Sequence, residues 1–127
     1  MNSNELSSKI IGAAIEVHKA LGPGLLESAY EACLCHELSL KRFSFERQKL
    51  LPIEYKGKQL DCGYRLDVVV EEAIIVELKS CERIEPIHKA QLLTYLKLSG
   101  LHLGLLLNFN TLVMRDGIVR VANELKE

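Results

Sequence analysis

Three charged side chains stand out in the segment Tyr64–Ser80, "YRLDVVVEEAIIVELKS", because the residues around them are of the kind that fills the centre of a sheet. Asp67 precedes a run of valines, and Glu77 and Lys79 alternate with aliphatic residues further on. A charge inside a covered strand is costly unless it is paired or binds a metal ion. The paired oxygens of two carboxylates, with an ammonium group as a neighbour, suit a hard divalent ion such as magnesium.

The spacing of these residues places them close together. Side chains alternate along a strand, so Glu77 and Lys79 share one face. If a tight turn at Glu71-Glu72 joins the two strands, Asp67 lies opposite Glu77, with Cβ atoms roughly 4.5–5.5 Å apart. Carboxylates that close repel each other unless a cation lies between them or one of them is protonated.

The charges themselves leave two interpretations open. Spacing alone favours a half-exposed sheet whose solvent face carries Asp67, Glu77 and Lys79 as cross-strand ion pairs. A covered functional site is favoured by Val69 and Ile75, which share the face of the charges, and by the amphipathic helices predicted on either side.

Hydrophobic periodicity predicts the elements that position these residues. Helices are expected over 4–21, from about Leu25 to Arg42, and from Pro86 to a stop at Gly100. Strands are expected over residues 44–55, 58–70, 73–80 and 103–109, and a terminal β-hairpin over 112–121 turning at Asp116-Gly117. The order α-α-β-β-β-α-β indicates an α/β fold with a mixed central sheet flanked by helices. At 127 residues, 1–127 forms one domain.

Two further groups of residues have sufficient structural explanations when taken alone. Gln91 and Tyr95 lie four apart on one helix face with His88 before them, which is compatible with a core tyrosine and surface neighbours. Glu27 lies in the first turn of its helix, where a carboxylate is favoured by the helix dipole. Tyr30, one turn on, is expected in the core.

Together these residues resemble a known family. "GLLESAY", residues 24–30, fits the G-x-x-E-x-x-Y motif of the GxxExxY proteins, and the similarity continues through "ERQKLLPIEYKGKQLDCGYRLDVVVE", "IIVELKS", "HKAQLLTYLKLSG" and "LLLNFN" in that order. That family is grouped with the PD-(D/E)XK nuclease superfamily. The resemblance implies a restriction-endonuclease-like αβββαβ core, which agrees with the predicted order of elements.

The resemblance also implies roles for single residues. Asp67 corresponds to the strand aspartate of the superfamily, and Glu77 and Lys79 to its E-x-K motif. Leu66 stands where the superfamily motif has proline, a position at which proline is often replaced.

Three more residues match motifs of this superfamily outside the strands. Gln91 and Tyr95 match the Q-x-x-x-Y helix motif of the RecB-type exonucleases. Glu27 matches an acidic residue that many members place on the helix before the sheet.

The function implied is a metal-dependent nuclease that hydrolyses phosphodiester bonds without strong sequence specificity, in DNA more than in RNA. Magnesium or manganese would be held by Glu27, Asp67, Glu77 and the Leu78 carbonyl. The catalytic set would be Asp67, Glu77, Lys79 and Gln91, and contacts to nucleic acid would come from Arg65, His88 and Tyr95. The alternative is a catalytically inactive nuclease-fold module that binds nucleic acid or a protein partner, which the acidic pI of 6.4 and the small size favour.

Composition limits the partners. A net charge of -1 gives no global attraction to nucleic acid, so binding would depend on local basic residues and phosphate contacts. No apolar run approaches the ~20 residues that span a bilayer, so no membrane is expected, and the polar N-terminus predicts a cytoplasmic protein. A homodimer through the terminal hairpin and the first helix is as well supported as a monomer in which both segments cover the sheet.

Overall fold

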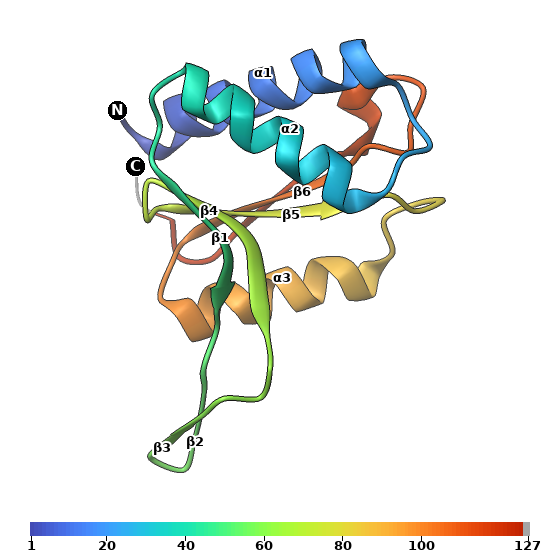
Figure 1. The fold of residues 1–127 in the computed structure, drawn as a ribbon. Coiled ribbons are helices and arrows are strands. Elements are labelled where there is room, and N and C mark those ends of the chain that lie inside the picture. Colours follow the sequence, from blue (N-terminus) through green and yellow to red (C-terminus); the bar gives the residue numbers. More distant parts are fainter. Residues whose placement is uncertain (126–127) are drawn as a thin grey trace.

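The fold is a five-stranded sheet between two layers of helices (Figure 1). The computed structural model describes residues 1–125. The helices are α1 (Ser3–Leu21), α2 (Glu27–Leu40), α3 (Pro86–Ser99) and the 3-10 helix η1 (Met114–Gly117). The strands are β1 (Phe45–Leu50), β2 (Ile53–Tyr55), β3 (Lys58–Leu60), β4 (Arg65–Val70), β5 (Ile74–Lys79), β6 (Leu103–Asn108) and β7 (Ile118–Ala122).

The sheet is mixed, as the sequence predicted. Its strand order is β1-β4-β5-β6-β7, and every neighbouring pair is antiparallel except β5 and β6, which are parallel. Helix α3 is the crossover that joins this parallel pair. The predicted restriction-endonuclease-like fold class is confirmed.

The predicted helix boundaries have clear local causes. Helix α1 begins after Asn2, whose side chain accepts the Glu5 N–H at 2.9 Å. Helix α3 begins with Pro86 next to a reciprocal cap between Glu85 and His88, and it ends at Gly100, which has a φ of 77°.

Two apolar clusters hold the layers together. Helices α1 and α2 cover one face of the sheet, and α3 covers the other (Figure 1). Strand β6 is buried along its whole length, which explains its nearly continuous apolar sequence. None of the helices in residues 1–125 combines the length and the hydropathy that a bilayer crossing requires.

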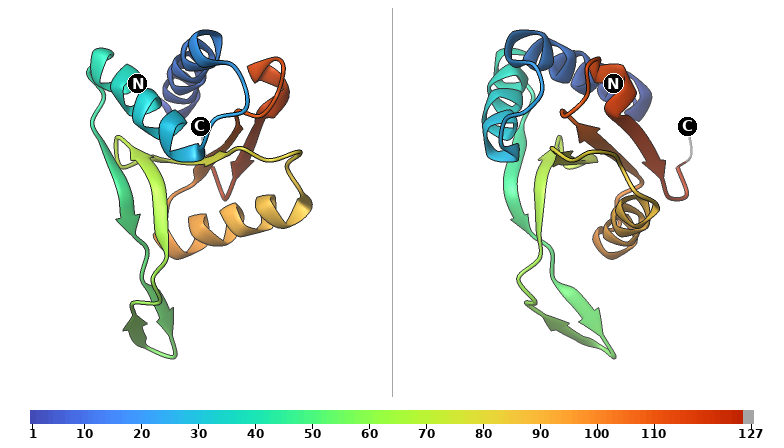
Figure 2. Two further views of the ribbon diagram at one scale, coloured as in Figure 1. Left: turned by 45° about the vertical axis from the view of Figure 1, so that its right-hand side comes forward. Right: turned by 90° about the vertical axis from the view of Figure 1, so that its right-hand side faces the viewer.

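Strands β2 and β3 form a separate hairpin that projects from the body (Figures 1 and 2). The sequence predicted two continuous strands here, but each is interrupted. Residues 51–52 separate β1 from β2 on the outward side of the hairpin, and residues 61–64 separate β3 from β4 on its return side. The predicted turn at Lys56-Gly57 is confirmed, with φ of 50° and 81°. Residues 51–64 are called the arm below.

The predicted C-terminal hairpin over residues 112–121 is wrong. Residues Met114–Gly117 form the 3-10 helix η1, and β7 pairs with β6 instead of with a strand at residue 112. A Cβ atom on Gly117 would collide with the Asn108 carbonyl oxygen, so the backbone approaches β6 as closely as glycine allows.

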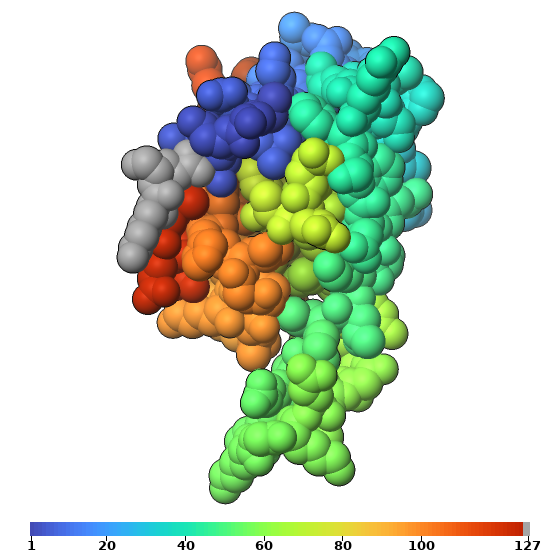
Figure 3. Space-filling view, turned by 90° about the vertical axis from the view of Figure 1, so that its left-hand side faces the viewer, coloured from blue at the N-terminus to red at the C-terminus, as the bar shows by residue number. Residues whose placement is uncertain are grey.

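The two ends of the described chain meet on one face. Arg120 of β7 donates from Nη2 to the Asn4 Oδ1 of α1 at 2.7 Å. Figure 3 shows the blue N-terminal segment beside the red C-terminal strand on this face, with the arm projecting away from both.

The close approach at Gly117 gives a first prediction. Gly117→Ala should lower the free energy of unfolding by about 1–3 kcal/mol, because the added methyl group must displace the Asn108 carbonyl. The matched control is Gly12→Ala in α1, where an added Cβ meets nothing within 4 Å and helix propensity should raise stability by up to about 1 kcal/mol. Urea unfolding measures both, and equal stabilities of the two variants would contradict the prediction.

Candidate active site

The site is built where strands β4 and β5 separate. Residues Glu71 and Glu72, both at positive φ, make the tight turn between them, and the register pairs Val68 with Val76. Continuing that register by one residue places Asp67 opposite Glu77, as the sequence predicted.

Two carboxylates replace the backbone ladder at this point. The Asp67 N–H donates to Glu77 Oε2 at 2.8 Å, and the Leu78 N–H donates to Asp67 Oδ2 at 2.9 Å. Each acidic side chain therefore crosses to the opposite strand and accepts an amide that would otherwise meet a carbonyl. These two hydrogen bonds hold each carboxylate against the backbone of the neighbouring strand.

The acidic pair is poorly solvated. Glu77 is 6% exposed, and burial raises its pKa to about 8, with the Asp67 carboxylate as the second cause. Burial also raises the pKa of Asp67, against the lowering effect of the Leu78 N–H. A cation between the two oxygens would offset both causes, so the pair is suited to bind one.

Lys79 lies close enough to act on both acids. Alternation along β5 places Lys79 on the same face as Glu77, and its ammonium group lowers the pKa of Asp67 and of Glu77. Asn108, which is 2% exposed, clamps the chain just beyond it. The Asn108 Oδ1 accepts the Cys81 N–H at 3.1 Å, and its Nδ2 donates to the Cys81 carbonyl at 3.0 Å.

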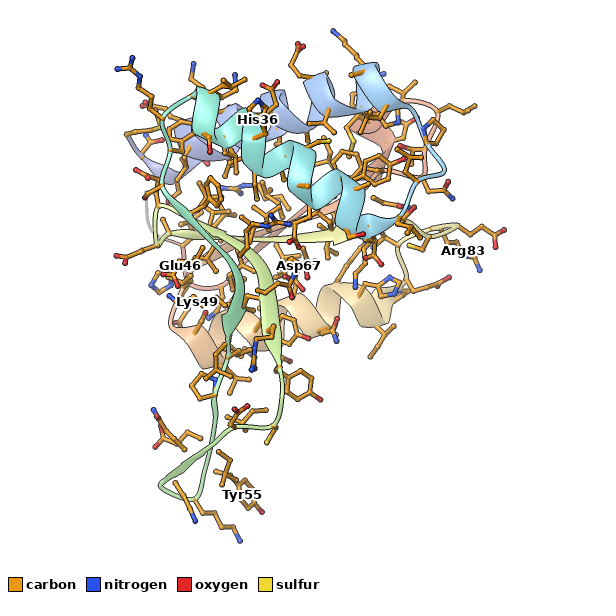
Figure 4. All side chains as sticks on the ribbon, in the orientation of Figure 1. His36, Glu46, Lys49, Tyr55, Asp67 and Arg83 are labelled. Atoms are coloured by element: carbon orange, nitrogen blue, oxygen red, sulfur yellow. The ribbon has the colours of Figure 1, made fainter. Side chains whose placement is uncertain are left out.

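A pocket of about 360 Å³ opens at the acidic pair. Its lining residues come from four elements, and Figure 4 draws Asp67 between α2 and α3. They are Glu27, Ser28 and Glu31 of α2, Gln48 of β1, Asp67 of β4 and Leu78 of β5. The structure therefore brings predicted metal-binding residues from α2, β4 and β5 into one cavity.

The sequence analysis missed two residues of this pocket. Glu31 is buried and accepts hydrogen bonds from Arg47 Nε at 2.9 Å and from Gln48 Nε2 at 2.8 Å. Gln48, at a φ of 50°, also forms a hydrogen bond that lowers the pKa of Asp67. The i,i+4 spacing from Glu27 could have identified Glu31, but no local pattern marks Gln48.

The segment "GLLESAY" holds α2 in place. The Tyr30 hydroxyl donates to the Gly22 carbonyl at 2.6 Å and accepts the Leu25 N–H at 3.0 Å. The Tyr30 ring is buried and stacks on Phe109 with centroids 4.4 Å apart. Tyr30 is therefore a core residue, as expected, that closes the loop from which Glu27 begins α2.

The other predicted site residues lie outside the pocket. Gln91 is exposed and lines a neighbouring cavity together with Tyr95. Tyr95 is buried in one apolar cluster with Val69 and Ile75, and its pKa is raised by burial and then by Glu77.

Two of the predicted phosphate contacts have local partners instead. His88 accepts the Glu85 N–H on Nδ1 at 2.9 Å, which is a capping role. Arg65 is exposed, donates to the Tyr64 carbonyl and lies 3.7 Å from Asp61. Neither His88 nor Arg65 lines the pocket that contains Asp67.

The pocket offers oxygen donors for a metal ion. Within the described part of the chain, no three or more histidine, cysteine, aspartate or glutamate side chains are gathered in a group that could hold one. The donors that fit a hard ion are Asp67, Glu77 and the Leu78 carbonyl, because two poorly solvated carboxylates lie side by side there.

Protonation of Glu77 gives a second prediction. In EDTA, the free energy of unfolding should fall as pH rises from about 4.5 to about 8, because folded Glu77 keeps a proton that the unfolded chain releases. The slope should reach at most about 1.4 kcal/mol per pH unit. Glu77→Gln should flatten it in urea titrations at several pH values, whereas a slope equal to wild type would contradict the assignment.

Comparison with known proteins identifies the family of the chain. The model of the PD-(D/E)XK nuclease superfamily matches residues 4–121. No curated protein and no solved structure gave a match. The matched segment contains every strand of the sheet except the last residue of β7, together with the acidic pair and α3. The chain belongs to the PD-(D/E)XK nuclease superfamily.

Proposed function

We propose that the protein is a metal-dependent nuclease that hydrolyses phosphodiester bonds. The observation that carries this proposal is the pair of crossed carboxylates, Asp67 and Glu77, with Asp67 lining the pocket and Lys79 on the same sheet face as Glu77. Burying two acids side by side is unfavourable in the free protein, and a functional role accounts for it.

The residues that would hold magnesium or manganese are Asp67, Glu77 and the Leu78 carbonyl. Glu27 is exposed at the rim of the same pocket and would complete the set, through a water molecule or directly. Glu31 is already engaged by Arg47 and Gln48, so we assign it to holding Gln48 against Asp67. When bound, the ion would polarise the phosphoryl oxygen and lower the pKa of a water molecule.

Lys79 would stabilise the charge that develops on the phosphate and orient the attacking water. Asn108 would position Lys79 by fixing the chain that follows it. Gln91, expected to fix the nucleophile or Lys79, lines the cavity next to the acidic pocket, from which its amide would reach bound substrate.

The proposed substrate is DNA more than RNA, bound without strong sequence preference. Phosphate contacts would come from basic side chains that leave their acidic partners to bind phosphate. Examples are Arg83, which pairs with Glu85 at 2.7 Å, and Lys49, which pairs with Glu46 at 3.4 Å. The geometry of "GLLESAY" supports placing the chain in the GxxExxY branch of the superfamily.

Cleavage assays give the third prediction. The wild-type protein should cut single- or double-stranded DNA with magnesium or manganese and lose activity in EDTA. Asp67→Asn, which keeps an acceptor for the Leu78 N–H, and Lys79→Ala should each lower the rate at least ~100-fold. Asp61→Asn changes an exposed carboxylate on the arm and is the matched control. Wild-type rates in either site variant would refute the assignment.

A second candidate function is an inactive module that uses this fold to bind nucleic acid or a protein. It is favoured by the backbone amide that each carboxylate already accepts, and by the fact that residues 1–125 gather no group of three or more side chains of the metal-binding types. The net charge of -1 agrees with a binding role that does not depend on general attraction to nucleic acid.

Magnesium titration by calorimetry separates the two functions and is the fourth prediction. A nuclease should bind magnesium at millimolar concentration or below, more tightly as pH rises because the ligands must lose their protons. Asp67→Asn should abolish the heat of binding. A folded wild-type protein that binds no magnesium at millimolar concentration would favour the inactive module.

We also propose that two copies associate when both strands of a duplex are cut. The candidate surface includes Leu112 and Val113, which are 92% and 50% exposed. These residues lie beside α1 in a shallow pocket that is lined by both segments.

A further inference from the structure

A second cavity lies in the angle between the arm and helix α3. Figure 2 shows the arm extending away from the body, past α3, which packs against the sheet. The cavity has a volume of about 270 Å³, and its walls include Leu51, Ile53 and Tyr64 from the arm and Ile87, Gln91 and Tyr95 from α3. It is called the slot below.

The slot combines buried and exposed apolar side chains. Leu51 and Tyr95 are buried, whereas Tyr64 is 44% exposed and Ile87 is 70% exposed. Gln91 and Thr94 add polar groups to these apolar walls. Ligand sites commonly combine apolar walls with a few polar groups that fix orientation.

The slot adjoins the acidic pair. The Tyr64 and Tyr95 rings lie 6.3 Å apart and are tilted by 60°. Tyr95 packs in one apolar cluster with Val69 and Ile75, which share the sheet face of Asp67 and Glu77, so the inner end of the slot lies over the strands that carry the carboxylates. A ligand in the slot would therefore have its neighbouring atoms beside the proposed reaction centre.

We infer that the slot holds one unstacked base of a single-stranded segment whose phosphodiester lies at the acidic pair. This inference rests on the proposed nuclease function and specifies its substrate. A base has a flat face that can stack on the exposed Tyr64 ring, and a polar edge that the Gln91 amide can both donate to and accept from. Duplex bases are stacked and paired, so they would not enter.

The surrounding charges favour a polyanion over an apolar peptide. Lys79 shares the sheet face of Glu77, and Arg65, adjacent to Tyr64, donates to the Tyr64 carbonyl at 3.0 Å and lies 3.7 Å from Asp61. Arg65 is exposed, so its remaining N–H groups are available to a phosphate. An apolar side chain from a second copy would leave the Gln91 amide without a partner.

Binding in EDTA tests the slot without cleavage. Fluorescence anisotropy would compare a labelled single-stranded DNA oligonucleotide with its blunt duplex at one salt concentration. Tyr64→Ala should weaken single-strand binding roughly 5- to 150-fold, the range for loss of one stacked base, and leave duplex binding unchanged. Tyr64→Phe should bind like wild type. Thermal melting checks that each variant is folded.

The matched control is Tyr55→Ala at the arm tip, where the exposed ring lies outside the slot. Unchanged single-strand affinity in Tyr64→Ala, or an equal loss in Tyr55→Ala, would overturn the inference. It would also be overturned if light scattering showed a dimer that Tyr64→Ala converts to a 14.3 kDa monomer. If Tyr64→Ala weakens single-strand binding but the wild-type protein cleaves nothing, the slot is retained and the proposed nuclease function is refuted. If the wild-type protein cleaves DNA but Tyr64→Ala binds single strands normally, the nuclease function is retained and the slot is refuted.

Discussion

The arrangement of the site depends on two hydrogen bonds in which the Asp67 and Glu77 carboxylates accept backbone N–H groups in place of backbone carbonyls. Past the Val68–Val76 pair, strands β4 and β5 are joined by acidic side chains, and the pocket opens at that place. Buried acids need donors and counter-charges, so the neighbouring elements are committed to supplying them. Helix α2 brings polar groups from one layer, and α3 closes the other face with the ring of Tyr95.

Much of this arrangement follows from local sequence. The turn at Glu71-Glu72 and the alternation beyond it are enough to place Asp67 opposite Glu77, because an antiparallel register is fixed once its turn is known. Pro86 and Gly100 mark the ends of α3 for reasons of backbone geometry alone. The family resemblance then assigned roles to residues that local patterns explain equally well as caps or core, such as Glu27.

What the sequence did not reveal depends on irregular backbone and distant packing. The return side of the arm holds two more linking residues than the outward side, so a uniform hairpin register would have paired Gln48 with Arg65 instead of Asp67. No sequence pattern predicts the positive φ of Gln48. The burial of the Glu31 carboxylate depends on hydrogen bonds from Arg47 and Gln48, which lie 16 and 17 residues away in the sequence. The prediction of a terminal hairpin was wrong because Gly117 packs closely against the Asn108 carbonyl of β6 instead of forming a hairpin turn.

The contact between Asn4 and Arg120 has a consequence for how the motifs are ordered. Because the start of α1 and the final strand lie side by side, a short linker could join them while the chain is opened at Lys56-Gly57, on the projecting arm. Such a circular permutant would present the acidic strands first and "GLLESAY" last, yet every packed layer could keep its neighbours. The geometry that the motifs build therefore does not by itself require the order in which they occur.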